Sequence, residues 1–92
     1  MIKKVIKLSA SWCFPCKMYA KTFEEVSQNE EFKDITFEEI DIEENEDAAE
    51  KYLVRSVPTT VVLDENDRVI HKVSGVLTKN NLEEILRGNF NG

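Results

Sequence analysis

Two cysteines, Cys13 and Cys16, carry the chemistry that is easiest to recognise in this sequence, and they are its only cysteines. Thiols separated by two residues can close a small disulfide ring and open it again. They stand between an apolar run that predicts a buried strand over residues 2–8 and a run that predicts a helix over residues 14–28. Because a helix N-terminus favours a negative thiolate, a thiol pair at this junction predicts a redox-active dithiol.

Two unrelated buried thiols, or one half of a zinc site, are the competing interpretations of the pair. A structural zinc site needs four ligands, and His71 is the only histidine of the chain. His71 alternates with Val69 and Val73 in a predicted strand, which is typical of a structural histidine. In a reducing compartment a close cysteine pair is catalytic or metal-binding. We therefore predict redox chemistry and no metal.

The charge balance narrows the possible partners. The 92 residues carry a formal net charge of −6 and a sequence pI of about 4.8, which argues against nucleic acid and against an anionic membrane surface as binding partners.

No segment of the sequence approaches the roughly 20 apolar residues of a membrane span. The basic start has too short an apolar part, interrupted by Lys7, for a secretion signal. We expect one domain over residues 1–92, acting as a cytoplasmic monomer.

Alternating strands and helices must position the dithiol. The sequence predicts strands at 2–8, 35–42, 59–63 and 68–73 and helices at 14–28, 46–53 and 79–87. This order, β-α-β-α-β-β-α, predicts an α/β fold with a four-stranded mixed sheet and three helices on its faces. The early strands are expected to be parallel, and the last two are expected to form a hairpin.

Helical periodicity predicts which residues of each helix face inward. Pro15 suits the first turn of the first helix, Thr78 can cap the last helix and Gly88 can end it. Met18 is expected to pack beside the cysteine motif. The predicted inner faces are Tyr19, Phe23 and Val26; Ala48, Ala49, Tyr52 and Leu53; and Leu82, Ile85 and Leu86.

Three motifs together resemble the thioredoxin superfamily, and the resemblance covers nearly the whole chain. Trp12-Cys13-x-Pro15-Cys16-Lys17 is similar to the active-site hexapeptide of that family. Val57-Pro58-Thr59 resembles its cis-proline loop, and Gly75 resembles the glycine that follows the hairpin near the substrate groove. The resemblance implies a thioredoxin fold and thiol-disulfide oxidoreductase activity without a bound cofactor.

The chain departs from the family pattern at three places. It lacks the extra N-terminal strand and helix, so its size is closer to that of a glutaredoxin. Phe14 stands where thioredoxins usually carry glycine. Lys7 replaces the buried aspartate of the family, six positions before the first cysteine, and Glu39 aligns with the lysine that often pairs with that aspartate. The comparison suggests that the two charges have exchanged places.

The motif assigns different roles to the two cysteines. Cys13 precedes the helix, so we expect an exposed sulfur, with a thiol pKa below the ordinary value of about 8.5, that attacks a substrate disulfide. Cys16 lies in the first turn, and we expect it to be more buried and to resolve the mixed disulfide. Strong oxidants of the superfamily usually have histidine where Pro15 stands, so Pro15 favours a reductant.

The resemblance also implies a substrate surface. We expect a cis bond before Pro58, and we expect the Val57 backbone to pair with an extended substrate segment. Trp12 and Phe14 would form an apolar rim for that peptide, and a core position is the alternative for Trp12. Lys17 completes the active-site motif.

Lys7 admits two interpretations. Behind Cys16, its buried ammonium would favour the nearby thiolate and could exchange a proton with it, with Glu39 as the partner of the ammonium. At the sheet edge, Lys7 would be solvated and would have no such effect. The first interpretation predicts that Lys7→Ala raises the thiol pKa of the dithiol, and an unchanged thiol titration would contradict it.

The acidic residues between Glu38 and Glu50 are most simply a solvated face together with charges that suit a helix start. A docking surface for a basic partner is the alternative.

Three functions remain open at this point. The first is reduction of protein disulfides, with electrons from a thioredoxin reductase or another thiol donor. The second is a glutaredoxin-like reductase that uses glutathione, although Ser74-Gly75-Val76 lacks the Gly-Gly and Asp that glutaredoxins usually carry after the hairpin. The third is a non-catalytic binding module with vestigial cysteines, against which the intact cysteines and proline loop argue.

Overall fold

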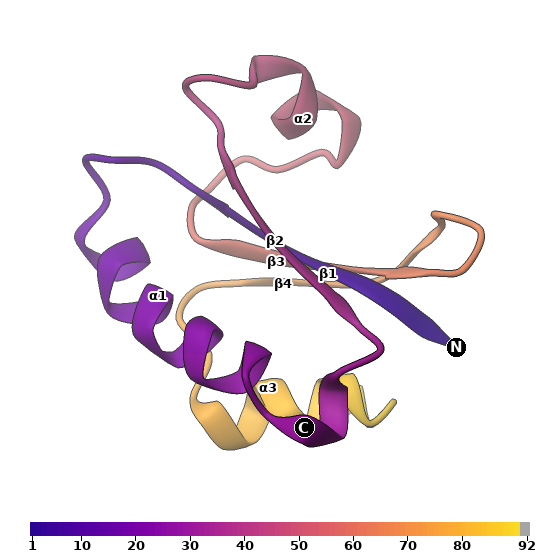
Figure 1. Cartoon of the computed structure of the whole chain (residues 1–92). Helices are drawn as coiled ribbons and strands as arrows, with labels where there is room; N and C mark the ends of the chain where they lie inside the picture. The colour runs from indigo at the N-terminus through magenta and orange to yellow at the C-terminus, as the bar shows by residue number, and fades with distance from the viewer. Residues whose placement is uncertain (91–92) are drawn as a thin grey trace.

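Four strands form one mixed sheet within residues 1–90, the part of the chain that the computed structural model describes (Figure 1). The order across the sheet is β2-β1-β3-β4. β1 is parallel to β2 and antiparallel to β3, and β3 and β4 form an antiparallel hairpin. This arrangement confirms the predicted mixed sheet. The strands are β1 (Ile2–Ser9), β2 (Thr36–Asp41), β3 (Thr59–Asp64) and β4 (Val69–Ser74).

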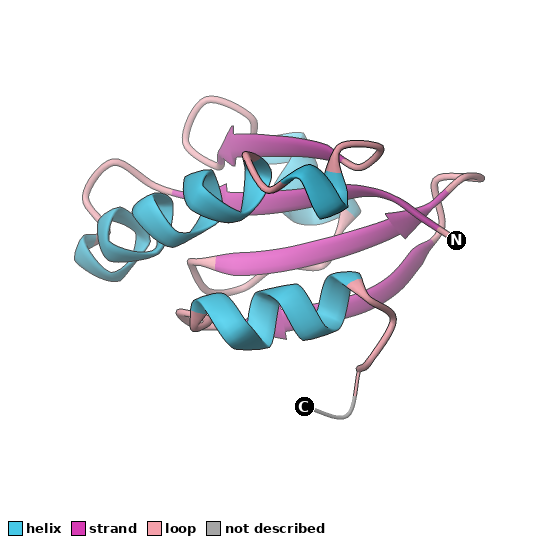
Figure 2. Ribbon diagram, turned by 60° about the horizontal axis from the view of Figure 1, so that its bottom comes forward, coloured by secondary structure: helices cyan, strands magenta, loops and turns pink. Residues whose placement is uncertain are grey.

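Helices cover both faces of this sheet. Figures 1 and 2 show α1 and α3 together on one face and α2 on the other. The described residues contain α1 (Phe14–Ser27), α2 (Glu46–Lys51), α3 (Lys79–Leu86) and a short 3-10 helix at Glu30–Phe32. The 3-10 helix is absent from the sequence prediction. It buries Phe32 in the core beneath α1 and α3.

β1 is a central strand because its residues can be buried on both faces of the sheet. Val5 belongs to the core on the side of α1 and α3, where Tyr19 is fully buried. Ile6 and Leu8 belong to the smaller core on the side of α2. The alternation of side chains along the strand therefore directs Lys7 toward α1, the helix that begins at the cysteines.

The residues that were predicted to cap and to terminate α3 do so in the structure. The Thr78 hydroxyl accepts a hydrogen bond from the Asn81 N–H and caps α3. Gly88 follows α3 with φ +89°, a conformation that glycine adopts without cost.

Leu53 is not part of an inner face, and that prediction is wrong. α2 ends at Lys51, and Leu53 has φ +55° and a side chain that is 75% exposed. The left-handed residue lets the Val54 N–H bond to the Ala49 carbonyl oxygen at 2.8 Å, which closes the helix. Val54 packs against the sheet in place of Leu53.

Candidate functional site

Cys13 is the N-cap residue of α1, at the end of the loop that leaves β1. Its backbone is extended, and its Sγ accepts a hydrogen bond from the Cys16 N–H at 3.2 Å. Pro15 occupies the first turn, where its missing N–H costs no helical hydrogen bond. A sulfur that receives a backbone N–H at the positive end of a helix is stabilised as a thiolate when the disulfide is open.

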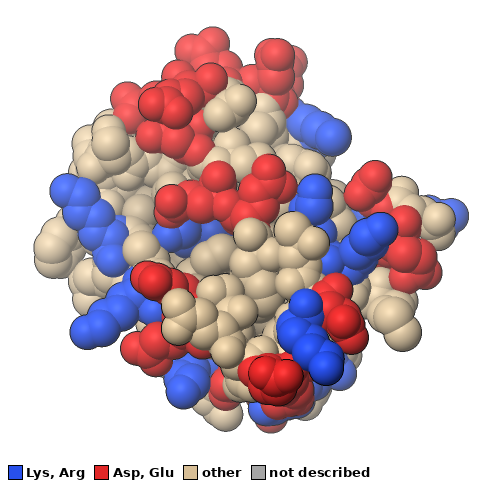
Figure 3. Space-filling model, in the orientation of Figure 1, with Lys and Arg blue, Asp and Glu red and all other residues tan. Residues whose placement is uncertain are grey.

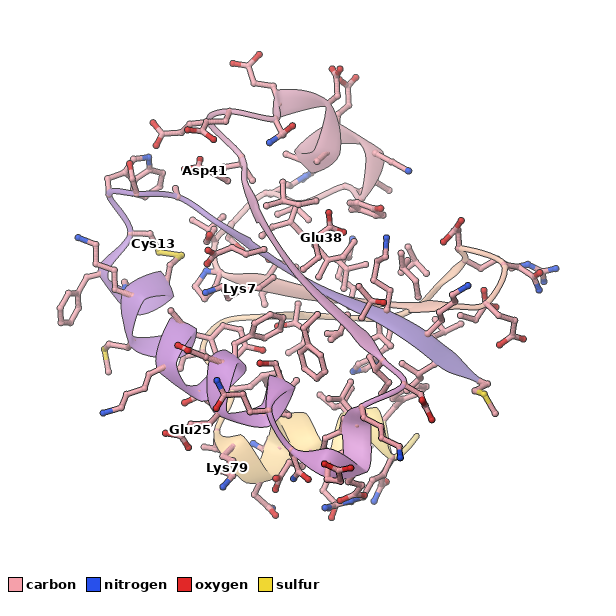
Figure 4. All side chains as sticks on the ribbon, in the orientation of Figure 1. Lys7, Cys13, Glu25, Glu38, Asp41 and Lys79 are labelled. Atoms are coloured by element: carbon pink, nitrogen blue, oxygen red, sulfur yellow. A yellow bond between two sulfur atoms is a disulfide. The ribbon has the colours of Figure 1, made fainter. Side chains whose placement is uncertain are left out.

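The sulfur atoms of Cys13 and Cys16 are joined in a disulfide, drawn in yellow in Figure 4. The side chains are 4% and 3% exposed, so the expectation of an exposed Cys13 and a more buried Cys16 is wrong for this oxidised state. Ala10 and Val57 pack against the pair. The Cys13 Sγ lies 3.6 Å from the Val57 carbonyl oxygen, which shields the sulfur from one side.

The loop before β3 faces the disulfide. The bond between Val57 and Pro58 is cis, and Pro58 is buried. The Pro58 carbonyl oxygen accepts a hydrogen bond from the Gly75 N–H at 2.8 Å, which ties this loop to the end of β4. Gly75 has φ +96°, and an added Cβ there would meet no atom within 4 Å. The structure thus places Val57 against the cysteines and ties the next residue, Pro58, to Gly75.

Two aromatic side chains flank the disulfide and point into solvent. Trp12 is 66% exposed and Phe14 is 70% exposed, so Trp12 is not a core residue. Lys17 is also exposed. Met18 is exposed as well, and the prediction that it packs beside the motif is wrong because its position on α1 faces away from the sheet.

Lys7 is buried, and the solvated alternative is therefore wrong. Its side chain is 2% exposed, and its Nζ lies 2.5 Å from Oε2 of Glu39, the residue opposite it on β2. The rings of Tyr19 and Phe23 lie within 6 Å of the ammonium, at 5.9 and 5.6 Å. Glu39 is 57% exposed and forms the solvent side of the pair. Figure 4 shows Lys7 on β1, on the side of the sheet that carries α1.

A cavity of about 390 Å³ connects the dithiol with the end of β2. Cys16 and Glu39 both line it, together with side chains that the motif analysis had not assigned: Ser9, Ser11, Asp41, Glu44 and Asn45. The parallel pairing of β1 and β2 could have revealed them, because the carboxyl ends of parallel strands meet at one edge of a sheet.

Other sequence features lie outside this site. His71 is half-buried and stacks on Phe90, with ring centroids 4.6 Å apart. Among residues 1–90, no group of three or more His, Cys, Asp or Glu side chains could hold a metal ion. No helix in the same range combines the length and hydropathy that crossing a bilayer requires.

The fold and the site define a class: a four-stranded α/β domain with a disulfide-forming cysteine pair at a helix N-terminus beside a cis-proline loop. The family model Thioredoxin matches residues 2–88. Thioredoxin of Mycoplasmoides gallisepticum is 36% identical over 85 residues, covering 92% of this chain and 82% of that protein. Thioredoxin of Staphylococcus epidermidis is 40% identical over 84 residues, covering 90% and 78% respectively.

A solved structure agrees with these relatives. The crystal structure of thioredoxin from Malassezia sympodialis superposes with a TM-score of 0.84 at 29% identity, covering 94% of this chain and 73% of that one. The chain belongs to the thioredoxin family. It is a thiol-disulfide oxidoreductase of protein disulfides, and Cys13 and Cys16 form its dithiol.

Proposed function

We propose that this chain is a single-domain, monomeric, cytoplasmic reductase of protein disulfides that receives its electrons from a thioredoxin reductase. The observation that carries the proposal is the Cys13–Cys16 disulfide at the start of α1, next to the Val57 carbonyl oxygen. Pro15 between the cysteines supports the reducing direction, because it places no positive charge beside the thiolate that would stabilise the reduced form.

The reduced protein uses its two thiols in sequence. The Cys13 thiolate attacks one sulfur of the substrate disulfide, the substrate S–S bond breaks, and the released substrate thiolate takes up a proton. Cys16 then loses its proton, and its thiolate attacks the Cys13 sulfur of the mixed disulfide. The second substrate thiolate leaves, and the Cys13–Cys16 disulfide forms. The dithiol loses two electrons, which the substrate gains, and a thiol donor must return them.

The Val57–Pro58 loop and the aromatic rim are suited to hold the substrate during this exchange. The Val57 carbonyl oxygen lies beside the Cys13 sulfur, so an extended segment that pairs with the Val57 backbone would bring its own disulfide to that sulfur. Trp12 and Phe14 offer exposed apolar surface on both sides of Cys13, and Gly75 leaves open space near Pro58.

Lys7 and Glu39 support the dithiol without contacting the substrate. The buried ammonium of Lys7 lies on the side of the sheet that carries α1, and its positive charge favours negative charge on the dithiol at the start of that helix. Glu39 pairs with Lys7 and also lines the cavity that Cys16 lines, so we infer that its carboxylate receives the Cys16 proton through water in that cavity and not by direct contact. We assign both as positioning residues of the reductase.

Two electron sources distinguish the candidate functions. We expect NADPH-dependent reduction of insulin disulfides with a thioredoxin reductase, and none with glutathione and glutathione reductase. Turnover with glutathione alone would instead establish the glutaredoxin-like reaction. No turnover with either donor or with dithiothreitol would mean that the chain is a binding module.

Single cysteine variants test the order of attack. Cys16→Ser should trap a mixed disulfide between Cys13 and the substrate, because the resolving thiol is absent. Cys13→Ser is the matched control and should trap none. A mixed disulfide that forms in Cys13→Ser and not in Cys16→Ser would reverse the assigned roles.

A further inference from the structure

One short segment accounts for the whole net negative charge of this protein. Residues 38–50 contain eight of the eighteen Asp and Glu residues and no Lys or Arg. The rest of the chain holds twelve Lys and Arg residues against ten Asp and Glu, so it is slightly positive. Figure 3 shows red atoms gathered at the top of the molecule, over α2 and the loop that precedes it. The protein is therefore electrically polarised.

The fold holds this acidic segment against the redox site. The Ile42 N–H donates to the Ser9 carbonyl oxygen at 2.9 Å, and the Ser11 hydroxyl donates to Glu43 Oε1 at 3.1 Å. Asp41 and Glu44 line the same cavity as Cys16. Figure 4 shows Asp41 on the side of the molecule that carries Cys13. The loop between β1 and α1 and the loop between β2 and α2 thus form one continuous surface.

Most of these carboxylates have no cation beside them. Within residues 1–90, only Glu38 and Glu39 of this segment form ion pairs, with Lys4 and Lys7 respectively. Glu46 and Asp47 lie in the first turn of α2, where the helix dipole accommodates them. The charges that precede that turn, Asp41, Glu43 and Glu44, lie outside the helix. The cavity is lined by the carboxylates of Glu39, Asp41 and Glu44 and by one cation, Lys17, so the balance of charge around it is negative.

The apolar contact surface of the site lies next to this potential. Trp12 and Phe14 flank the cysteines and are largely exposed, and Ser11, which is bonded to Glu43, directly precedes Trp12. A partner that covers the aromatic side chains must bring its neighbouring residues close to the carboxylates. A partner with carboxylates there would be repelled, and a partner with ammonium or guanidinium groups would be attracted.

We propose that this face selects protein disulfides flanked by Lys or Arg. The proposal rests on the proposed reductase function and names its substrate class. The apolar rim supplies contact area, and the acidic surface of Asp41, Glu43 and Glu44 speeds the encounter with cationic segments and slows the encounter with anionic ones. The chemistry stays the thiol-disulfide exchange described above, so no additional reactant is needed.

Two synthetic peptides test this selectivity. Both have the same length and one intramolecular disulfide; one has Lys on each side of its cysteines and the other has Glu at those positions. The fully reduced protein is mixed with each peptide, and the rate is followed by the fluorescence of Trp12, the only tryptophan, which adjoins Cys13. At low ionic strength we expect the Lys peptide to react about ten times faster. As added salt screens the charges, this ratio of rates should fall toward the ratio measured when a small neutral thiol reduces the same two peptides.

A pair of variants with equal charge change locates the effect. Glu43→Gln/Glu44→Gln removes two charges beside the site and keeps an amide oxygen for the Ser11 hydroxyl. Glu25→Gln/Asp67→Asn removes two charges elsewhere: Figure 4 shows Glu25 on α1 away from Cys13, and Asp67 lies in the turn between β3 and β4. We expect the first variant to lower the Lys-to-Glu rate ratio about threefold or more and the second to leave it unchanged within about a factor of two.

The outcomes separate the proposal from the reductase function. Equal rates for both peptides at low salt, or an equal loss of preference in both double variants, would overturn the proposal and leave the reductase function standing. Failure to reduce either peptide would overturn both. The salt dependence is measured on the unmodified protein, so the test does not depend on how well the variants fold.

Discussion

The Lys7–Glu39 pair should respond very differently to the loss of each partner. The two side chains are unequally buried, at 2% exposed for Lys7 and 57% for Glu39. The ammonium is surrounded by the rings of Tyr19 and Phe23 and depends on the carboxylate for its charge compensation. The carboxylate has water on its other side. The pair is therefore a buried cation held by a solvated anion.

The structure sets the size of each effect on the free energy of unfolding. Glu39→Gln leaves the ammonium buried without an anion, a situation that costs about 3–5 kcal/mol when a pair is fully buried. Because a Gln oxygen can still accept a hydrogen bond and the cavity is open beside it, we expect a loss of about 2–3 kcal/mol. Lys7→Met removes the buried charge, keeps an apolar chain against the rings and leaves Glu39 hydrated. It should change stability by about 1 kcal/mol or less.

Urea denaturation of the oxidised protein measures these differences, and a second pair provides the control. Lys4 and Glu38 also join β1 to β2, at 3.5 Å, but both side chains are partly exposed. Lys4→Met and Glu38→Gln should each cost about 1 kcal/mol or less and should not differ in the same way. A larger loss for Lys7→Met than for Glu39→Gln would refute the reasoning.

The same two variants test the effect of the pair on the dithiol. In the reduced protein, Lys7→Met should raise the thiol pKa because a cation is lost, and Glu39→Gln should lower it because an anion is lost. The ultraviolet absorbance of the thiolate, followed against pH, reports both shifts. Identical titration curves for both variants and the unmodified protein would remove Lys7 and Glu39 from the mechanism.

Two further predictions concern stability and pH. Burial raises the pKa of Tyr19 to about 12. Between pH 10 and pH 12 the unfolded chain therefore loses the phenol proton while the folded chain keeps it. Over this range the free energy of unfolding should fall by about 3 kcal/mol. Tyr19→Phe removes the 2.7 Å hydrogen bond to Thr60, should cost about 1 kcal/mol at pH 7 and should flatten that alkaline decline in urea titrations. The Arg87 guanidinium donates to both carboxylate oxygens of Glu31 and lowers the pKa of that carboxyl in the folded protein. The pair therefore stabilises the fold at pH values above the pKa that Glu31 has in the unfolded chain. This stabilisation is lost as the pH falls through the lower pKa that Glu31 has in the folded protein. Glu31→Gln should therefore lose stability relative to the unmodified protein at pH 7 and approach it at pH 3, and an equal difference at both pH values would contradict this.

Local patterns in the sequence predicted most of the fold and the centre of the site. The element order, the cap at Thr78 and the end of α3 at Gly88 depend on residues close together in the chain, and the structure agrees with them. Leu53 was placed on the wrong face because helical periodicity does not reveal a left-handed residue at a helix end. The prediction for Met18 was wrong for a related reason, because a residue that is next to a motif in the sequence need not have its side chain packed against that motif.

The sequence by itself determined that two thiols stand at a strand-to-helix junction, because spacing, strand pattern and helix start are all local properties. Only the tertiary structure decided that Lys7 is buried, since that depends on β1 lying between β2 and β3 and on α1 covering it. It also decided that the acidic segment lies beside the cysteines, because parallel pairing of β1 and β2 brings together loops about thirty residues apart. Electrostatic interactions and burial depend on distances between residues in three dimensions, and local patterns in the sequence do not determine those distances.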